Sequence, residues 1–475
     1  MRDRPRGLVG VCDQHSSTSG FLGNSIIPRR GRGRDSGHKR VKESPLFGFA
    51  IIEFSIVYVI SPALLNIDNS QLLRYPSKSN QKKQKNTFEM STMKAVKHQP
   101  QGSISVVEVP IPDIKEGQYL VKTVAAAHNS IDNDIIEYGL AGGPGSSVGF
   151  DFAGIIERTG PGTSGRFSLG DRVAGMVHGC NTHTPAEGAY QEYIPAEEHM
   201  LWKIPGNMEL RQAAALGAAV LTAALSLYNE LKIPVPGEGK VEEGTWLLVY
   251  GASSSVSQSV LQLAKLAGFR IVATASQRNH ELVKSLGAEY VFEYRDINQC
   301  IKSIKSVVGD DLRYAHDSIC QGDSTRIVLD CISSKGGKVA CTIPVPPEKV
   351  NRKDVEMGNI DVFAVAGREY SFMGNTCPAV PSYKTLFQKF SPIFERLIAD
   401  GKFKLQGTRE MTGSLESVKD GFAEFKAGKA NQLKLSDLFP APVLESAEVR
   451  EFLDGDYGIR LTAGDLSGSF YELKI

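Results

Sequence analysis

Small residues gather at one turn of the chain, where a backbone could approach a phosphate group closely. The turn follows an apolar run, Trp246–Tyr250, and precedes a segment whose apolar residues recur at helical spacing. A helix N-terminus offers free N–H groups and the positive end of a dipole, both of which bind anions. We therefore predict that the pyrophosphate of a dinucleotide binds at Gly251 and the residues that follow it, Ser253, Ser254, Ser255 and Val256.

The glycine pattern of this turn is incomplete. A dinucleotide-binding turn usually reads G-x-G-x-x-G, and here only Gly251 is in register, because Ser253 and Val256 stand at the later glycine positions. The motif is weak by itself. The order of strand, turn, helix and second strand, Ile271–Ala275, supports it by predicting a βαβ unit.

The end of the second strand indicates which nucleotide binds. An NAD site usually carries Asp or Glu about 20 residues beyond the glycines, where it holds the ribose 2′-hydroxyl. Here no carboxylate occurs before Glu281, and the polar side chains could instead bind a 2′-phosphate. NADP(H) is therefore the predicted cofactor, and its 2′-phosphate would bind at Ser276, Gln277, Arg278 and Asn279. The alternative is that these residues form an ordinary polar loop.

Length and composition limit the classes of protein. A chain of 475 residues is long enough for two or more domains, and a net charge of +1 argues against a general nucleic-acid partner. The seven cysteines form no C-x-x-C pair, as expected for free thiols in a reducing compartment. We expect a cytoplasmic protein.

The first 92 residues predict a largely disordered extension, because most of them are polar or rich in Arg, Gly and Ser. Within it, residues 46–67 form an apolar run that is about long enough to span a bilayer. Glu53 interrupts the run at a cost of about 2.5–3.5 kcal/mol, and basic residues flank both ends. A membrane anchor is therefore the less favoured alternative.

The rest of the chain predicts an α/β fold with a doubly wound parallel sheet. Short strands with Gly and Pro punctuation run from residue 93 to about 205, and a helical segment follows at 209–233. After the βαβ unit, residues 327–332 and 338–343 are predicted strands. Two amphipathic helices are expected at 384–400 and 415–427.

This order of elements resembles the medium-chain dehydrogenase/reductase superfamily, and in particular its zinc-independent, quinone oxidoreductase-like branch of fungal trans-acting enoyl reductases. The residues that carry the resemblance are His128–Asp132, Gly149–Gly154, Gly170–Val173, Gly188–Tyr193 and Leu286–Glu289. It implies a β-rich GroES-like domain at 93–219, a Rossmann domain at 220–372 and a return to the first domain at 373–440. Residues 441–475 remain an unassigned tail.

The resemblance also implies a set of binding residues. Beside the turn and the polar loop described above, Tyr294 would lie near the adenosine. The nicotinamide would be bordered by Asn129, Ser130, Ile131 and Asp132, although the family commonly has Pro where Ser130 stands. The substrate cleft would be lined by two segments, Leu216, Gly217, Ala218, Ala219, Val220, Leu221, Thr222 and Ala223, and Ala340, Cys341, Thr342, Ile343 and Pro344.

No metal site is expected. A catalytic zinc in this superfamily needs Cys, His and Cys at fixed places, and Asn129 and Phe150 stand at two of them. His178, Cys180 and His183 are close in sequence but lack a fourth partner. They are interpreted as part of a solvated loop at the mouth of the cleft.

Hydride transfer to an already activated acceptor is the reaction that suits a zinc-free reductase. The leading hypothesis is reduction of an enoyl thioester that is small or carrier-bound, with a polyketide synthase as partner. The alternatives are a quinone oxidoreductase and a non-catalytic NADPH-binding partner protein. A monomer or homodimer is expected, and the catalytic proton donor is unknown; possible polar groups, each more readily explained as structural, are Asp132, Tyr190 and Lys434.

Overall fold

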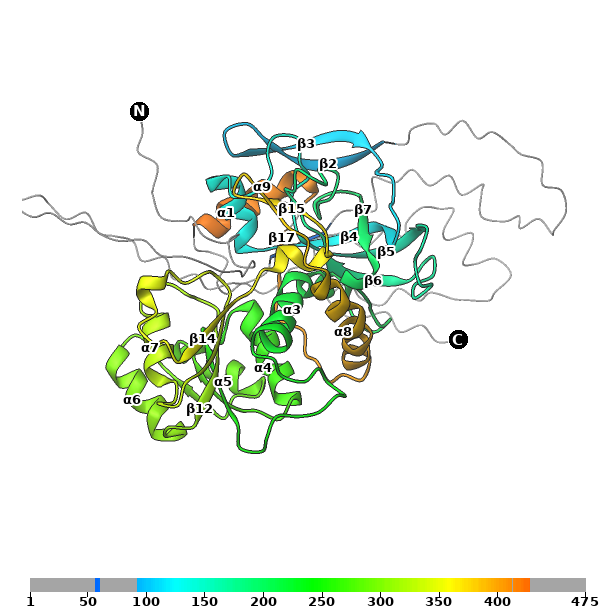
Figure 1. The fold of residues 1–475 in the computed structure, drawn as a ribbon. Coiled ribbons are helices and arrows are strands. Elements are labelled where there is room, and N and C mark those ends of the chain that lie inside the picture. The colour runs from blue at the N-terminus through cyan, green and yellow to red at the C-terminus, as the bar shows by residue number, and fades with distance from the viewer. Residues whose placement is uncertain (1–55, 60–91, 412, 428–475) are drawn as a thin grey trace, which may run out of the picture.

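Two sheets divide the molecule into two lobes. The computed structural model describes residues 56–59, 92–411 and 413–427. Figure 1 shows the β-rich lobe, with β4, β5 and β6, above the lobe that contains β12 and β14. The fold is that of the predicted α/β class.

The lower lobe is a six-stranded parallel sheet in the order β11-β10-β9-β12-β13-β14. Chain order reverses between β9 and β12, and in doubly wound sheets ligands bind at such a point, beyond the carboxyl ends of the strands. The elements are β9 (Trp246–Tyr250), α4 (Ser255–Leu266), β10 (Arg270–Thr274), α5 (His280–Ser285), β11 (Tyr290–Phe292), α6 (Ile297–Val308), β12 (Leu312–Asp317), α7 (Ser324–Cys331), β13 (Gly337–Cys341) and β14 (Val355–Asn359).

Burial on both faces explains why β9 is a continuous apolar run. Leu247 and Val249 belong to the larger hydrophobic core, which also contains α4, while Trp246, Leu248 and Tyr250 pack in the second core with α6 and α7. Parallel strands covered by helices on both faces require apolar side chains at successive positions.

The predicted strand at 327–332 is wrong, because these residues belong to helix α7 and its end. Ile327 and Val328 are buried, whereas Arg326 and Asp330 pair across one helical turn at 3.7 Å. The missing strand is β12, whose carboxyl end carries the buried polar residues His316 and Asp317. A short apolar run does not distinguish the buried side of a helix from a strand.

The upper lobe is mainly antiparallel. Its large sheet has the order β17-β1-β4-β5-β6-β8, with β7 paired to β4, and β2 and β3 form a separate hairpin. The elements are β1 (Ile56–Val59), β2 (Thr92–Gln99), β3 (Ser103–Pro110), β4 (Gln118–His128), α1 (Ser130–Tyr138), β5 (Asp151–Thr159), β6 (Arg172–Met176), β7 (Tyr193–Glu197), β8 (Leu201–Lys203) and β17 (Arg409–Met411).

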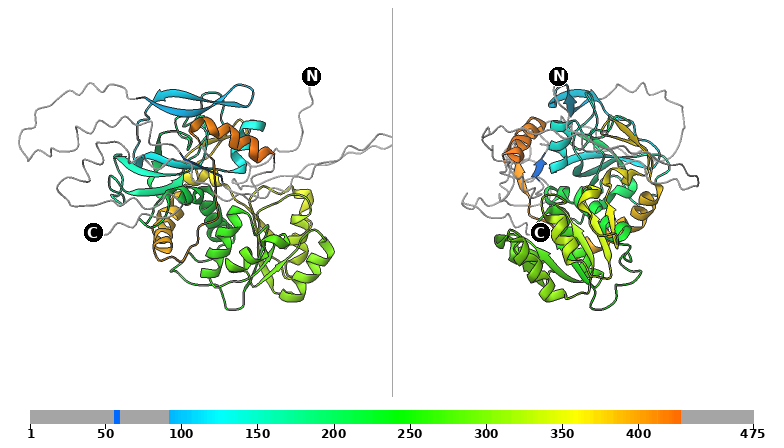
Figure 2. Two further views of the ribbon diagram at one scale, coloured as in Figure 1. Left: turned by 180° about the vertical axis from the view of Figure 1, so that it is seen from behind. Right: turned by 60° about the vertical axis from the view of Figure 1, so that its left-hand side comes forward.

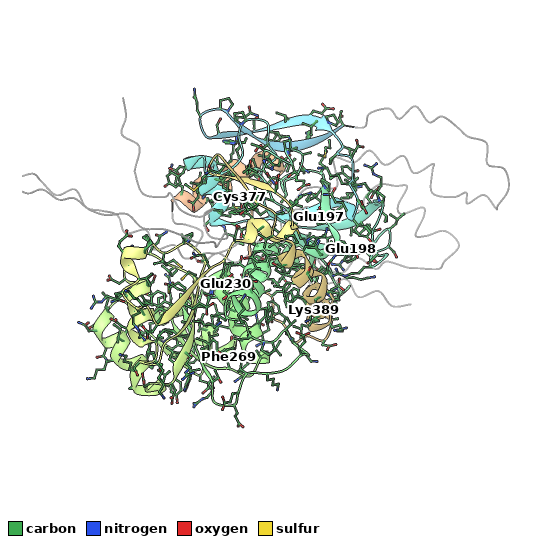
Figure 3. All side chains as sticks on the ribbon, in the orientation of Figure 1. Glu197, Glu198, Glu230, Phe269, Cys377 and Lys389 are labelled. Atoms are coloured by element: carbon green, nitrogen blue, oxygen red, sulfur yellow. The ribbon has the colours of Figure 1, made fainter. Side chains whose placement is uncertain are left out.

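A helical segment connects the lobes, as predicted for 209–233. It consists of α2 (Leu210–Ala213), a 3₁₀ turn (Ala214–Leu216), α3 (Gly217–Ala224) and a π-helix (Leu225–Glu230). Among the described residues, Leu210–Glu230 is the one helix apolar and long enough to cross a membrane, and 89% of the window that meets this test is buried inside the protein. Figure 3 shows Glu230 near the junction of the lobes, with Glu197 in the upper lobe and Phe269 in the lower one.

The chain then returns to the upper lobe. The remaining elements are a 3₁₀ helix (Val362–Ala366), β15 (Tyr370–Phe372), β16 (Asn375–Cys377), α8 (Pro381–Ala399) and α9 (Val418–Lys426). The views in Figure 2 agree that α9 lies in the upper lobe, where it contacts α1. This confirms the two predicted C-terminal helices, while the exact domain boundaries stay predictions.

The N-terminal extension is not entirely without structure. Ile56–Val59, from the apolar run 46–67, forms β1 and pairs with β4 and β17, and Thr92 begins β2. The sequence predicts a largely disordered extension, and these residues are the part of it that the structure describes as strand. The rest of 1–92, and the tail 441–475, lie outside the described residues.

Candidate functional site

The turn after β9 is shaped by Gly251. Its φ is +72°, and a Cβ atom there would lie 2.7 Å from both Ser318 Oγ and Ile319 Cγ1. Ser254 caps α4 by accepting a hydrogen bond from the Ser257 N–H at 3.1 Å. The turn thus brings the backbone and the N-terminus of a 12-residue helix to the edge of the sheet, as a pyrophosphate site requires.

The point where strand order reverses is fixed by hydroxyl groups. Ser318 Oγ lies 3.1 Å from the Tyr250 carbonyl and 3.2 Å from the Gly251 carbonyl, and Ser254 Oγ donates to it at 3.1 Å. The turns after β9 and β12 are therefore joined. Since only small side chains occupy this turn, the residues fit a dinucleotide phosphate.

The predicted ribose corner lies at the carboxyl end of β10. Ser276 is buried, Gln277 and Arg278 are exposed, and Asn279 Nδ2 donates to Ser276 Oγ at 3.3 Å. Glu293 Oε2 accepts from the Gln277 N–H at 3.3 Å. The carboxylate that reaches this corner is thus held by a backbone amide.

An aromatic pair lies beside that corner. The rings of Tyr250 and Tyr294 are 6.1 Å apart, and the Arg295 guanidinium lies 5.5 Å from the Tyr294 ring. Arg295 also pairs with Glu293 at 2.7 Å, which offsets the charge of that carboxylate. Tyr294 is therefore close to the predicted adenosine side, two residues beyond β11, the strand adjacent to β10.

The predicted nicotinamide border forms the start of α1. Asn129 precedes the helix, and its N–H donates to Asp132 Oδ2 at 2.8 Å. Ser130 and Ile131 are half-buried, whereas Asp132 is buried. Burial raises the pKa of Asp132 well above its usual value, and the Tyr190 hydroxyl lies 3.4 Å from its carboxyl group.

Asp151 connects this border to the substrate cleft. Its Oδ1 accepts a hydrogen bond from the Ala218 N–H at 2.6 Å, near the start of α3. A Cβ at Gly217 would lie 2.3 Å from the same oxygen, so the close approach requires glycine. Burial raises the pKa of Asp151 to about 7, although hydrogen bonds from Ala218 and the Asn129 side chain oppose that shift.

The two predicted cleft segments have different surroundings. Residues 216–223 end the 3₁₀ turn and form most of α3, and among them Ala218 is the one that is not fully buried. Ala340 and Cys341 are buried at the end of β13, while the next three residues are half-buried. A hydrogen bond of 2.9 Å between His316 and Ser226 joins the sheet to the π-helix that continues α3.

The side chains of His178, Cys180 and His183, which are close in sequence, do not come together as a metal site. The prediction of a solvated loop is wrong for His178 and Cys180, which are buried because they pack into the core of the β-rich lobe and its aromatic cluster. His183 Nε2 lies 3.3 Å from Thr376 Oγ1. Across the described part of the chain, no three His, Cys, Asp or Glu side chains come together as a possible metal site. The remaining polar candidate, Lys434, lies outside the described residues.

Sequence reasoning missed one residue that links the site together. Gln406, in the loop before β17, accepts a hydrogen bond from Ser255 Oγ and donates one to the Ala215 carbonyl at 2.6 Å. It therefore connects the phosphate turn to the cleft. No local motif surrounds Gln406, so the sequence carries no signal for this contact.

The geometry defines a class of protein: a parallel nucleotide-binding sheet whose ligand edge faces an antiparallel β-rich lobe. Two family models match, an alcohol dehydrogenase GroES-like domain at residues 115–206 and a zinc-binding dehydrogenase at residues 255–390. The chain is thus an oxidoreductase of the medium-chain dehydrogenase/reductase superfamily, a class that uses a nicotinamide cofactor.

Curated relatives narrow the class. The chain is 31% identical over 346 residues to trans-enoyl reductase ACTTS2 of Alternaria alternata, covering 73% of this chain and 98% of that protein. It is 34% identical over 328 residues to trans-enoyl reductase eqxC of Fusarium heterosporum, covering 68% and 92%. The chain belongs to the fungal trans-enoyl reductase family.

A solved structure supports the fold. CurK enoyl reductase superposes with a TM-score of 0.58 at 19% identity, covering 72% of this chain and 97% of that one. The family resemblance inferred from sequence motifs is therefore confirmed, while the roles of individual site residues stay predictions.

Proposed function

We propose that this protein uses NADPH to reduce the activated C=C bond of an enoyl thioester, without a catalytic metal, on substrates carried by a polyketide synthase. The observation that carries the proposal is the Asp151–Ala218 contact, in which the carboxyl group next to Phe150 accepts a hydrogen bond from a backbone N–H. Family membership supplies the reaction class.

The preference for NADPH rests on the ribose corner. Arg278 is exposed and can approach a dianionic phosphate, and Ser276 and Asn279 supply hydroxyl and amide groups beside it. Glu293, the nearby carboxylate, is engaged by the Gln277 N–H and by Arg295. A 2′-phosphate therefore meets donors here, whereas a bare 2′-hydroxyl would lack the usual carboxylate acceptor.

The proposal of metal-free chemistry rests on the donor set. Phe150 offers no ligand atom, and Asp151 next to it is committed to α3 through the Ala218 N–H. Asn129 offers only an amide, which is a poor zinc ligand compared with a thiolate. A substrate that already carries an activating thioester carbonyl needs no Lewis acid for hydride attack.

The bound nicotinamide would supply the hydride, and the protein supplies position. The glycine turn and α4 would hold the pyrophosphate, and the start of α1 would border the ring. The buried segment 216–223 would exclude water from the reacting atoms. The names of the relatives support a thioester presented by a separate synthase, since each is called a trans-enoyl reductase.

An acceptor comparison tests this function. Purified full-length protein is mixed with NADPH and, in turn, crotonyl pantetheine thioester, a small quinone and a simple ketone, and NADPH depletion is followed. We expect rapid turnover with the thioester, unchanged by a strong chelator. Turnover with the quinone alone, binding of NADPH without any turnover, or loss of activity with the chelator would each refute the proposal.

A further inference from the structure

His178 is a buried imidazole that packs against two aromatic rings, Phe363 and Phe150, which also contact each other with ring centroids 5.6 Å apart. Its ring lies 4.8 Å from that of Phe363 at 22°, and 5.9 Å from that of Phe150 at 28°. Phe363 belongs to the 3₁₀ helix that follows β14, whereas Phe150 directly precedes β5. The imidazole therefore lies in an aromatic cluster to which both lobes contribute.

The ring nitrogens of His178 have no protein partner. The residue is 2% exposed, and within the described residues neither Nδ1 nor Nε2 makes a hydrogen bond. The neighbouring hydroxyl is unavailable, because Tyr370 donates to the Asp361 carboxylate. Buried polar atoms nearly always have partners, so this pair requires an explanation.

The charge state of His178 makes it a hydrogen-bond donor at one nitrogen. Burial, together with the nearby positive charges of Arg368 and His183, lowers the pKa of His178 to about 3. The ring is therefore neutral at physiological pH and carries one N–H group. A neutral imidazole can stabilise a developing oxyanion without first losing a proton to it.

His178 lies beside the candidate site. The N–H of Val177, its neighbour, donates to the Phe150 carbonyl at 2.8 Å. Phe150 is followed by Asp151, which holds the start of α3. The residue before His178 is thus bound to the residue before Asp151, which places His178 near the contact between Asp151 and α3.

Phe363 covers one face of the imidazole. Its side chain is half-buried and rests on Phe372, also half-buried, with 5.0 Å between ring centroids. Contact between a substrate oxygen and His178 therefore requires the Phe363 side chain to move.

We infer that His178 donates a hydrogen bond to the carbonyl oxygen of the enoyl thioester and stabilises the negative charge that this oxygen gains during reduction. The inference rests on the proposed function. The β-carbon gains a C–H bond with both electrons of the hydride, and the alkene π pair moves to the α-carbon and the carbonyl oxygen. A proton from water then bonds to the α-carbon, the nicotinamide is oxidised and the alkene is reduced. The imidazole keeps its proton throughout.

Three variants test the role. His178→Phe preserves the stacking but removes the donor, His178→Gln keeps a donor, and His98→Phe controls for the loss of another buried imidazole, on β2. With NADPH and crotonyl pantetheine thioester, we expect kcat to fall about 10²- to 10³-fold in His178→Phe, the range found for single oxyanion donors. His178→Gln should recover about tenfold of that loss, and NADPH affinity should not change.

A spectroscopic measurement separates hydrogen bonding from packing. Infrared difference spectra of a thioester labelled with ¹³C at the carbonyl, bound with NADP⁺ so that no hydride is transferred, should show a lowered C=O stretch in the unmodified protein and in His98→Phe. The shift should disappear in His178→Phe.

The outcomes distinguish this inference from the proposed function. If the unmodified protein reduces the thioester but His178→Phe keeps kcat within about threefold, or keeps the shifted C=O band, the role of His178 is refuted while the function stands. If the unmodified protein reduces no enoyl thioester, both proposals fail. Should His178→Phe not fold, unchanged kcat in a folded His178→Leu, which has no hydrogen-bond donor, would refute the role, and a large loss with an unshifted C=O band would support it.

Discussion

Cofactor selectivity at the carboxyl end of β10 gives the sharpest test of the candidate site. The perturbation is Arg278→Ala, alone and combined with Ser276→Ala. Arg278 is exposed and Ser276 is buried, and neither side chain shapes the glycine turn itself. The two changes should therefore remove contacts to a 2′-phosphate and leave the pyrophosphate site intact.

The expected magnitude follows from the exposure of each group. A guanidinium–phosphate contact is charge-assisted, but solvent around the exposed Arg278 screens it to about 1–2 kcal/mol. The buried Ser276 hydroxyl adds about 1 kcal/mol. Together they correspond to an NADPH affinity about 30- to 150-fold weaker, whereas NADH affinity should change less than about threefold because its ribose carries no phosphate.

Fluorescence titration of each protein with NADPH and NADH measures both dissociation constants. Arg326→Ala is the matched control, since Arg326 is also exposed but lies on α7 and pairs with Asp330. The effect of Arg278→Ala should shrink at high salt. Equal weakening of both nucleotides, or none, would show that the 2′-phosphate does not bind here.

Three further predictions concern single groups. Gly251→Ala should weaken the affinity for both nucleotides at least tenfold and lower the free energy of unfolding by about 1–3 kcal/mol, because a Cβ at φ +72° meets Ser318 and Ile319. Nucleotide titration and thermal unfolding measure these effects. Gly206→Ala is the control, because a Cβ there meets open space. Asp151 has a pKa raised to about 7 by burial, so the folded state binds the extra proton and its contribution to stability is lost as pH rises from about 4 to about 7. Asp151→Asn should therefore unfold with a flatter pH dependence than the unmodified protein over that window, and parallel curves would contradict the assignment. Arg368 pairs with two buried carboxylates, so Arg368→Met should lower the free energy of unfolding by about 3–5 kcal/mol near pH 8. The loss should be smaller near pH 5, because burial raises the pKa of both carboxyl groups and they take up protons as the pH falls. Denaturant unfolding at both pH values measures the two losses, and equal losses would contradict the prediction.

Elements that are amphipathic or apolar along their whole length could be predicted from the sequence. β9, α4 and β10 follow from local patterns, since strand burial and helical periodicity are both written in consecutive residues. β12 could not be found this way. It is a central strand that carries buried His316 and Asp317 at its end, and their partners, Ser226 and the amides of Ile319 and Cys320, are fixed only by the fold.

The candidate site divides in the same manner. The glycine turn and the polar loop after β10 lie within one βαβ unit, so their relation could be anticipated. Asp151, His178 and Gln406 act through partners that are distant in sequence: Asp151 binds Ala218, His178 stacks on Phe363, and Gln406 joins Ser255 to Ala215. No local rule connects residues that become neighbours only when the two lobes meet.

The proposed metal-free site has a consequence for the chemistry. At a position where the resemblance expects a zinc ligand, this chain has the apolar ring of Phe150, and the adjacent carboxyl group binds the start of α3. In the proposed reaction no Lewis acid meets the charge on the substrate oxygen, so that charge needs a neutral donor or water. His178 fits that need. It is buried and neutral, it follows Val177, whose N–H binds the Phe150 carbonyl, and its ring N–H has no partner among the described residues. Under the proposed function, the phenyl ring at position 150 and the unpaired imidazole of His178 are therefore parts of one arrangement, which suits a substrate activated by its own thioester.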